Sequence, residues 1–351
     1  MDEGAFGMNL RTDLAIEAVE QFIGEANVGL GKEERNISGL KVTCIDIPKQ
    51  QEEKIGKKAG RYVSIDTTSV DMLDSDALEK ARQVFSEELM RMMIHKGLDA
   101  EATCLMIGLG NEHITPDALG PMVADNVMVT RHLYKLGEEY LDAEYREVSA
   151  LAPGVMGMTG IETYDVIESV VGKIKPDFLI VVDALAARAV SRVNKMIQMT
   201  DTGVSPGSGV GNRRRAVDST SLGIPVIAIG VPTVVDAVSI TSDMVDLLLK
   251  HLGKSMYEGD RAYSKLLTGA PAKQNYTEED MPSIEIREKF LGQIGILNTD
   301  EKRQLLQEVL TPSGFNMIVT PKDIDDQIES LAKLISNGLN VGLHSKVNFS
   351  T

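Results

Sequence analysis

The chain has 351 residues, 43% of them hydrophobic, and is long enough to bury a large core in one domain or two. A net charge of -16 disfavours general adhesion to nucleic acid or to an anionic membrane, but it does not exclude a basic protein partner. No apolar run approaches the roughly 20 residues that a membrane helix needs, and the short acidic N-terminus is unlike a secretory signal. These features predict a cytoplasmic protein without direct contacts to membrane or nucleic acid.

The first hundred residues begin with an arm and continue with helices and β-rich runs. Residues 1–9 have no hydrophobic periodicity, whereas the apolar spacing over residues 11–23 predicts a helix. The remaining elements predicted here are strands over residues 40–47 and 61–66 and a long amphipathic helix over residues 76–95.

Strands and helices alternate clearly from residue 103 onward. The predicted strands cover residues 103–109, 145–150, 177–183 and 224–231. The predicted helices cover residues 116–136, 161–174 and 241–252, and residues 184–196 are expected to be helical in part. This alternation is typical of βαβ units, and strands that are apolar throughout are buried on both faces. The sequence therefore predicts an α/β fold, a three-layer sandwich with a mostly parallel sheet.

The pattern changes after Gly253. Residues 254–283 are polar and irregular, residues 284–310 have helical spacing, and a short strand-like run and a closing helix follow over 316–320 and 324–339. We therefore expect an α/β core over residues 8–253 and a helical extension over residues 254–351 that packs on it.

Two aspartates, Asp117 and Asp183, each follow an apolar strand-like run. Ligands of open α/β sheets bind beyond the carboxyl ends of the strands. Two carboxyl groups placed there could share a proton and activate a water molecule. The alternative is that both acids cap helices: Asp117 lies in the first turn after Thr115 and Pro116, and Asp183 precedes residues 184–196.

Histidine and cysteine give weaker signals. None of the five histidines has the spacing of a metal motif, and only His113 lies near a predicted strand end. A metal-assisted hydrolase that uses His113 with Asp117 and Asp183 stays an alternative, but the prediction is for no metal and no cofactor. Cys44 and Cys104 lie in apolar runs and are expected to be buried thiols of a reducing compartment.

Three further motifs have ordinary explanations. Gly253-Lys254-Ser255 lacks the earlier glycine of a phosphate-binding loop, and Gly203-Val204-Ser205-Pro206-Gly207 lacks the strand and helix of a nucleophile elbow. Arg213, Arg214 and Arg215 form either a solvated loop tip or an anchor for acidic groups of a substrate.

Several segments, in order along nearly the whole chain, together resemble the germination proteases, or spore proteases, of endospore-forming bacteria. They include Arg11-Thr12-Asp13-Leu14-Ala15, Gly108-Leu109-Gly110-Asn111 and Thr115-Pro116-Asp117-Ala118-Leu119-Gly120-Pro121. The others lie at residues 152–157, 159–163, 181–188, 201–212 and 317–322. The resemblance is specific because many short matches occur in the same order.

The resemblance implies an atypical aspartic endopeptidase with Asp117 and Asp183 as the catalytic carboxyl groups and with a fold similar to hydrogenase-maturation proteases. It implies a zymogen that removes an N-terminal propeptide, which we place at residues 1–7, and a catalytic core over residues 8–253. It further implies a homotetramer in the forespore or spore core. The implied substrates are small acid-soluble spore proteins, cut next to a glutamate that Arg213, Arg214 and Arg215 could hold.

Overall fold

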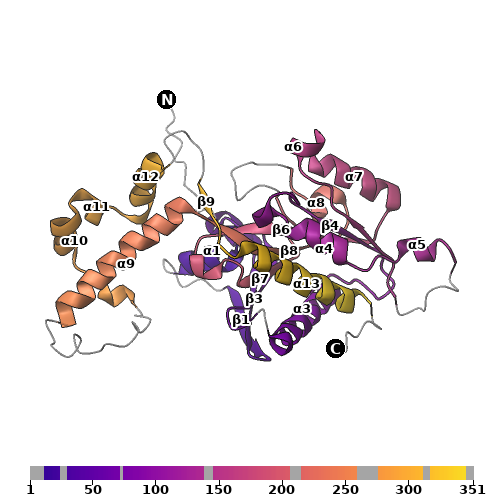
Figure 1. Cartoon of the computed structure of the whole chain (residues 1–351), viewed down its shortest axis with the longest axis horizontal. Coiled ribbons are helices and arrows are strands. Elements are labelled where there is room, and N and C mark those ends of the chain that lie inside the picture. The colour runs from indigo at the N-terminus through magenta and orange to yellow at the C-terminus, as the bar shows by residue number, and fades with distance from the viewer. Residues whose placement is uncertain are drawn as a thin grey trace. The chain divides into compact units, whose positions relative to one another are not determined.

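The computed structural model describes residues 12–23, 30–71, 74–137, 145–205, 215–258, 276–310 and 317–344. The predicted propeptide at residues 1–7 lies outside these ranges. The chain divides into two compact units, one containing residues 9–235 and 320–351 and the other built on residues 236–319. This division falls at residue 235 rather than at the expected residue 253, and it assigns the closing helix to the larger unit (Figure 1).

The larger unit contains the sheet. Its strands are β1 (Gly31–Ile37), β2 (Leu40–Ile47), β3 (Gly60–Asp66), β4 (Cys104–Gly108), β5 (Val148–Leu151), β6 (Phe178–Ala187), β7 (Met196–Thr200) and β8 (Val226–Asp236). The strand order is β1-β2-β3-β7-β8-β6-β4-β5. Strands β8, β6, β4 and β5 pair in parallel, and the pairings from β1 through β3 and β7 to β8 are antiparallel.

Helices cover both faces of this sheet. The helical segments of the unit are α1 (Ala15–Ile23), η1 (Lys49–Gln51), α2 (Glu52–Ile55), α3 (Ser75–His95), η2 (Thr115–Asp117), α4 (Leu119–Asn126), α5 (Arg131–Tyr134), α6 (Met156–Thr159), α7 (Thr163–Ile174), η4 (Val190–Arg192), α8 (Ser219–Leu222) and α13 (Ile324–Leu343). Helices α3, α4 and α13 pack on one face of the sheet and α7 packs on the other. Alternate residues of β6 enter the two cores, Ile180 and Val182 on one side and Leu179 and Val181 on the other. The predicted three-layer α/β class is confirmed.

Two predicted elements differ from the structure near the aspartates. The segment from Ala184 is not a helix: β6 continues to Ala187, because residues 184–187 pair with β8, and only Val190–Arg192 forms a helical turn. The long helix predicted over residues 116–136 is divided into η2, α4 and α5, with an extended backbone at Val127. Strands β1 and β7 were not predicted. Strand β1 is a charged edge strand without an apolar run, and β7 begins at the end of the segment that was expected to be helical in part.

The smaller unit contains α9 (Ala237–Glu258), η7 (Glu278–Asp280), α10 (Ile284–Leu291), α11 (Gln293–Ile296), α12 (Thr299–Leu310) and β9 (Ile318–Val319). An ion pair between Lys302 and Asp246 joins α12 to α9. Gly253-Lys254-Ser255 lies inside α9, where a side chain at Gly253 would meet the carbonyl of Asp280, so the segment is not a phosphate-binding loop. In the described ranges we find no helix that is long and apolar enough to cross a membrane.

Candidate active site

Asp183 lies inside the central strand β6, between β4 and β8. The residue is only 9% exposed, and its Oδ1 accepts a hydrogen bond from the N–H of Ala184 at 2.9 Å. Because the chain continues as a strand, Asp183 does not cap a helix, and the capping interpretation of this residue is wrong. A carboxyl group at this position is enclosed by the sheet and is costly to ionise.

Asp117 is the last residue of η2, in the loop that connects β4 to α4. Its Oδ2 accepts a hydrogen bond from the N–H of Asn111 at 2.9 Å, and its carbonyl accepts another from the same group at 3.1 Å. Helix α4 begins at Leu119 without a side-chain cap. Asp117 is therefore held against the preceding loop and does not cap α4, contrary to the capping interpretation.

Two features fix this loop beside the sheet. Gly110 has φ of +120°, and a Cβ there would lie 2.0 Å from the carbonyl oxygen of Asp117, so only glycine fits. The buried hydroxyl of Thr233, on β8, donates to the carbonyl of Pro116 at 2.6 Å. These contacts hold Asp117 on the side of the sheet where β4 ends.

Burial and the neighbouring acids both disfavour ionisation of the Asp183 carboxyl group. Burial raises the pKa of its carboxyl group well above the usual range, and the negative charges of Asp117 and Asp13 raise it further. A hydrogen bond from Ala184 opposes the shift. The two aspartates singled out in the sequence are thus close enough for the negative charge of Asp117 to disfavour ionisation of Asp183.

Asp13 is a third acid of this site that the sequence reasoning did not identify. Its N–H donates to the carbonyl of Ala186 at 2.9 Å, and its Oδ2 accepts from the N–H of Ala186 at 2.8 Å. The register of β6 against β8 shifts between Leu185 and Ala186, a bulge of the kind that often occurs beside active sites. Asp13 lies within one of the segments that carry the family resemblance, but an acid before a helix gives no further sign of this contact.

A lysine accompanies the third acid. The Nζ of Lys57 donates to the carbonyl of Thr12 at 2.7 Å. Burial lowers the pKa of Lys57, while the negative charges of Asp13 and Glu17 oppose that shift. Glu17 is itself buried and accepts hydrogen bonds from Thr12 and from the N–H groups of Arg188 and Ala189. Hydrogen bonds therefore hold the first turn of α1 against the residues that follow β6.

The other predicted residues lie elsewhere or outside the described ranges. Arg213 and Arg214 lie outside them. The guanidinium of Arg215 is stacked 4.0 Å from the ring centroid of Tyr164 and lies 3.7 Å from Glu168. His113 is exposed and contacts Glu112 at 3.6 Å. Within the described part of the chain, no three His, Cys, Asp or Glu side chains form a group that could hold a metal ion.

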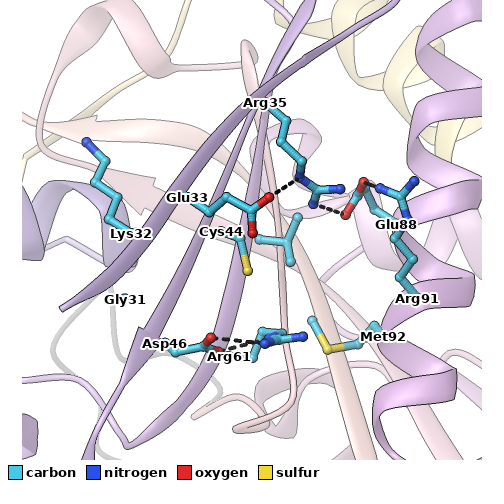
Figure 2. Close-up of a pocket in the computed structure, with 11 residues that line it drawn as sticks. Gly31, Lys32, Glu33, Arg35, Cys44, Asp46, Arg61, Glu88, Arg91 and Met92 are labelled. Atoms are coloured by element: carbon cyan, nitrogen blue, oxygen red, sulfur yellow. Dashed lines mark hydrogen bonds and ion pairs between the residues drawn. The ribbon is translucent and has the colours of Figure 1, made fainter.

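Cys44 and Cys104 are buried free thiols, as predicted, and burial raises the pKa of Cys104 to about 12. Cys44 lies at a separate cavity of about 360 Å³, which is formed by β1, β2, β3 and α3 and contains neither aspartate of the pair. Figure 2 shows that the arginines of this cavity pair with its carboxylates: Arg35 with Glu33 and Glu88, Arg91 with Glu88, and Arg61 with Asp46. We place the candidate active site at the aspartates, since the arginines of this cavity are already engaged by carboxylates.

Comparison with known proteins identifies the family. Residues 12–351 match the profile of the germination protease family. The chain belongs to this family. It is 51% identical to a germination protease of Bacillus velezensis over 348 residues, covering 97% of this chain and 94% of the relative. It is 48% identical to a germination protease of Bacillus subtilis over 347 residues, with coverage of 97% and 94%.

A solved structure of a [NiFe] hydrogenase maturation protease, HycI from Thermococcus kodakarensis, is 19% identical and covers 38% of this chain and 75% of its own, with a TM-score of 0.26. Membership of the germination protease family makes the chain a hydrolase of peptide bonds associated with spore germination.

Proposed function

We propose that the chain is an aspartic-type endopeptidase in which Asp117 and Asp183 are the two catalytic carboxyl groups. The observation that supports this most directly is the carboxyl group of Asp183, buried in a central strand and facing the charge of Asp117. A pair of carboxyl groups in which one keeps its proton and the other ionises is the arrangement that activates water in aspartic peptidases.

The two groups have different tasks in this mechanism. Ionised Asp117 takes a proton from a water molecule as the water oxygen bonds to the scissile carbonyl carbon, and protonated Asp183 gives its proton to the carbonyl oxygen. When the tetrahedral intermediate collapses, Asp117 returns its proton to the leaving nitrogen as the C–N bond breaks. Asp183 recovers a proton from a hydroxyl of the intermediate, so both groups end as they began.

The decisive experiment replaces each carboxyl group. Asp117→Asn and Asp183→Asn should each lower cleavage of a basic spore-protein peptide by about 10²–10⁴-fold, because an amide cannot accept the proton of water or supply an acidic one. Asp177→Asn is the matched control, since Asp177 directly precedes the same strand but is exposed and bonded to Thr103. If a folded Asp117 or Asp183 variant keeps more than about a tenth of the wild-type turnover, its catalytic role is wrong.

We further propose that the substrates are small acid-soluble spore proteins, that the enzyme works as a homotetramer in the spore core, and that residues 1–7 are an inhibitory propeptide. The names of the relatives, germination proteases of Bacillus species, support the setting in spores.

A pro-segment inhibits by occupying or distorting a site, and its removal releases that inhibition. A chain that starts at Met8 should therefore cleave without a lag, and equal initial rates for this chain and the full-length chain would contradict the proposal.

A further inference from the structure

The cavity in Figure 2 combines an apolar base with charged walls. Its apolar base consists of Cys44, Val63 and Met92, which lie on β2, β3 and α3 and are all buried. Cys44 and Val63 are paired across the two strands. A volume of about 360 Å³ lies in the range of sites that hold small organic molecules. The cavity is therefore large enough for a compact ligand whose apolar part lies on this base.

Gly31 keeps one end of the cavity open. It lies on β1, directly opposite Asp46 of β2. A Cβ at this position would meet only the Cβ of Asp46, at an ordinary 3.8 Å, and the backbone of Gly31 is not left-handed. Neither crowding nor backbone conformation requires glycine here, and a glycine in a strand often marks a place where a ligand approaches closely.

The charges that line the cavity leave a positive excess. The cationic residues are Lys32, Arg35, Arg61 and Arg91, and the acidic residues are Glu33, Asp46 and Glu88. Four cations thus meet three acids in a chain whose net charge is -16. Glu34, which pairs with Lys32, is shared with Lys41 and does not line the cavity. One monoanion would balance the charges of the cavity.

The three acids of the cavity are not held equally. Glu88 is 2% exposed and accepts from two arginines, and Asp46 accepts from Arg61 through both carboxylate oxygens. The side chain of Glu33 is 70% exposed and lies 3.4 Å from the Nε of Arg35. This Nε is buried and makes no hydrogen bond with the described residues. Exposed ion pairs contribute little, so Glu33 is the acid that an incoming carboxylate can replace.

We propose that this cavity binds a small organic monocarboxylate with an apolar body, such as a short aliphatic or aromatic acid. The carboxylate of the ligand replaces Glu33 as the partner of Arg35, and its body lies on the apolar base. An Arg–carboxylate contact is stronger where water is partly excluded than in the exposed pair that it replaces. The site is separate from the aspartates, and its occupation does not depend on the proposed endopeptidase function.

The test measures binding of benzoate to the full-length chain by isothermal titration calorimetry, with benzamide and inorganic phosphate as comparison probes. Benzoate should bind with a Kd of about 1 mM or below, a value in the range for a ligand of this size. Benzamide should bind about tenfold more weakly or worse, because it lacks the charge that Arg35 attracts. Phosphate should be weaker by a similar factor, since it has no apolar surface to bury on the base.

Two variants connect binding to the cavity. Gly31→Leu should weaken benzoate binding by about tenfold or more, because its side chain fills the open end. Gly172→Leu is the matched control and should bind benzoate like wild type, because Gly172 is an exposed residue of α7 where a Cβ meets no atom within 4 Å. Glu33→Gln removes the competing acid and should tighten benzoate binding by about twofold or more, the factor expected from an exposed pair.

Each probe and variant has a result that would overturn the inference. These results are no benzoate binding to wild type, benzamide or phosphate that binds as tightly as benzoate, and equal affinities of Gly31→Leu and Gly172→Leu for benzoate. If Gly31→Leu does not fold, as judged by circular dichroism, Glu33→Gln decides the question. Benzoate binding that is unchanged or weaker in folded Glu33→Gln would show that the carboxylate does not replace Glu33 at Arg35.

Discussion

Asp183 of the active site and Asp46 of the cavity in Figure 2 lie on strands of the same sheet, β6 and β2, but have opposite environments. At the cavity, a bidentate contact with Arg61 lowers the pKa of Asp46, and Glu88 lies between Arg35 and Arg91. At the active site, burial and two other acids raise the pKa of Asp183. The neighbours of a carboxyl group, and not its residue type, decide whether it is a structural anion or an acid that can give up its proton.

The largest effect on stability should come from the cavity. Glu88 is 2% exposed, and Glu88→Gln would leave two arginines without their shared anion. A fully buried pair broken in this way costs about 3–5 kcal/mol, and the partial exposure of the arginines lowers our expectation to about 2–3 kcal/mol. Urea unfolding measures the loss, while kcat/KM of the folded variant should stay within about twofold of wild type.

Glu87→Gln is the control for this experiment, because Glu87 lies on the same helix and only reaches Arg91 at 3.9 Å. Its loss should be below about 1 kcal/mol, as for exposed pairs. Equal losses for Glu87→Gln and Glu88→Gln would show that the cavity does not depend on its buried anion.

The pKa shifts of Asp183 and Asp46 have opposite signs, so pH should affect their contributions to stability in opposite directions. Asp183 has a raised folded pKa, so its contribution to stability is fully present below the unfolded value of about 3.9 and is lost as the pH rises through the folded pKa. Asp183→Asn should therefore melt a few degrees above wild type at neutral pH, and the difference should vanish below about pH 4. Thermal unfolding across this pH range measures it.

Asp46→Asn should show the opposite sign. The folded pKa of Asp46 is lowered, so its contribution is present above the unfolded value and is lost as the pH falls through the folded pKa. Because Asp46 and Arg61 are partly exposed, the loss at neutral pH should be only about 0–1 kcal/mol. If both variants respond to pH in the same direction, the contrast between the two regions is incorrect.

A smaller effect is expected at Arg215, which is stacked on Tyr164 and is more than half exposed. Arg215→Gln should cost about 0.5–1 kcal/mol, the value of an exposed cation–π contact. It also tests the sequence-based hypothesis that Arg213, Arg214 and Arg215 hold a substrate carboxylate. A loss of the preference for a Glu peptide over its Gln analogue in this variant would support that hypothesis, and an unchanged preference would make Arg215 an ordinary solvated residue.

The smallest effect should follow removal of metal ions. The histidines are scattered along the sequence without paired-ligand spacing, and the exposed His113 contacts Glu112. Exhaustive chelation should leave peptide cleavage unchanged. Activity that disappears on chelation and returns with one divalent ion would favour the metal-assisted alternative.

Much of the fold near the site followed from local patterns. Most ends of β2, β4, β6, α3 and α7 were predicted to within a few residues. Burial on one or both faces of an element produces a regular spacing of apolar residues, which can be recognised in the sequence. The extension of β6 to Ala187 was missed, since Ala-Leu-Ala-Ala suits a helix until it is paired with β8. The same extension removed the capping interpretation of Asp183.

By itself, the sequence determined the α/β class, the two aspartates at the strands and the resemblance to germination proteases. Only the tertiary structure decided what surrounds Asp183. Asp13 meets Ala186 across 173 residues of chain and Lys57 meets Thr12 across 45, separations at which no local pattern operates. A pKa depends on burial and on charges a few ångströms away, and these exist only when distant segments are packed together.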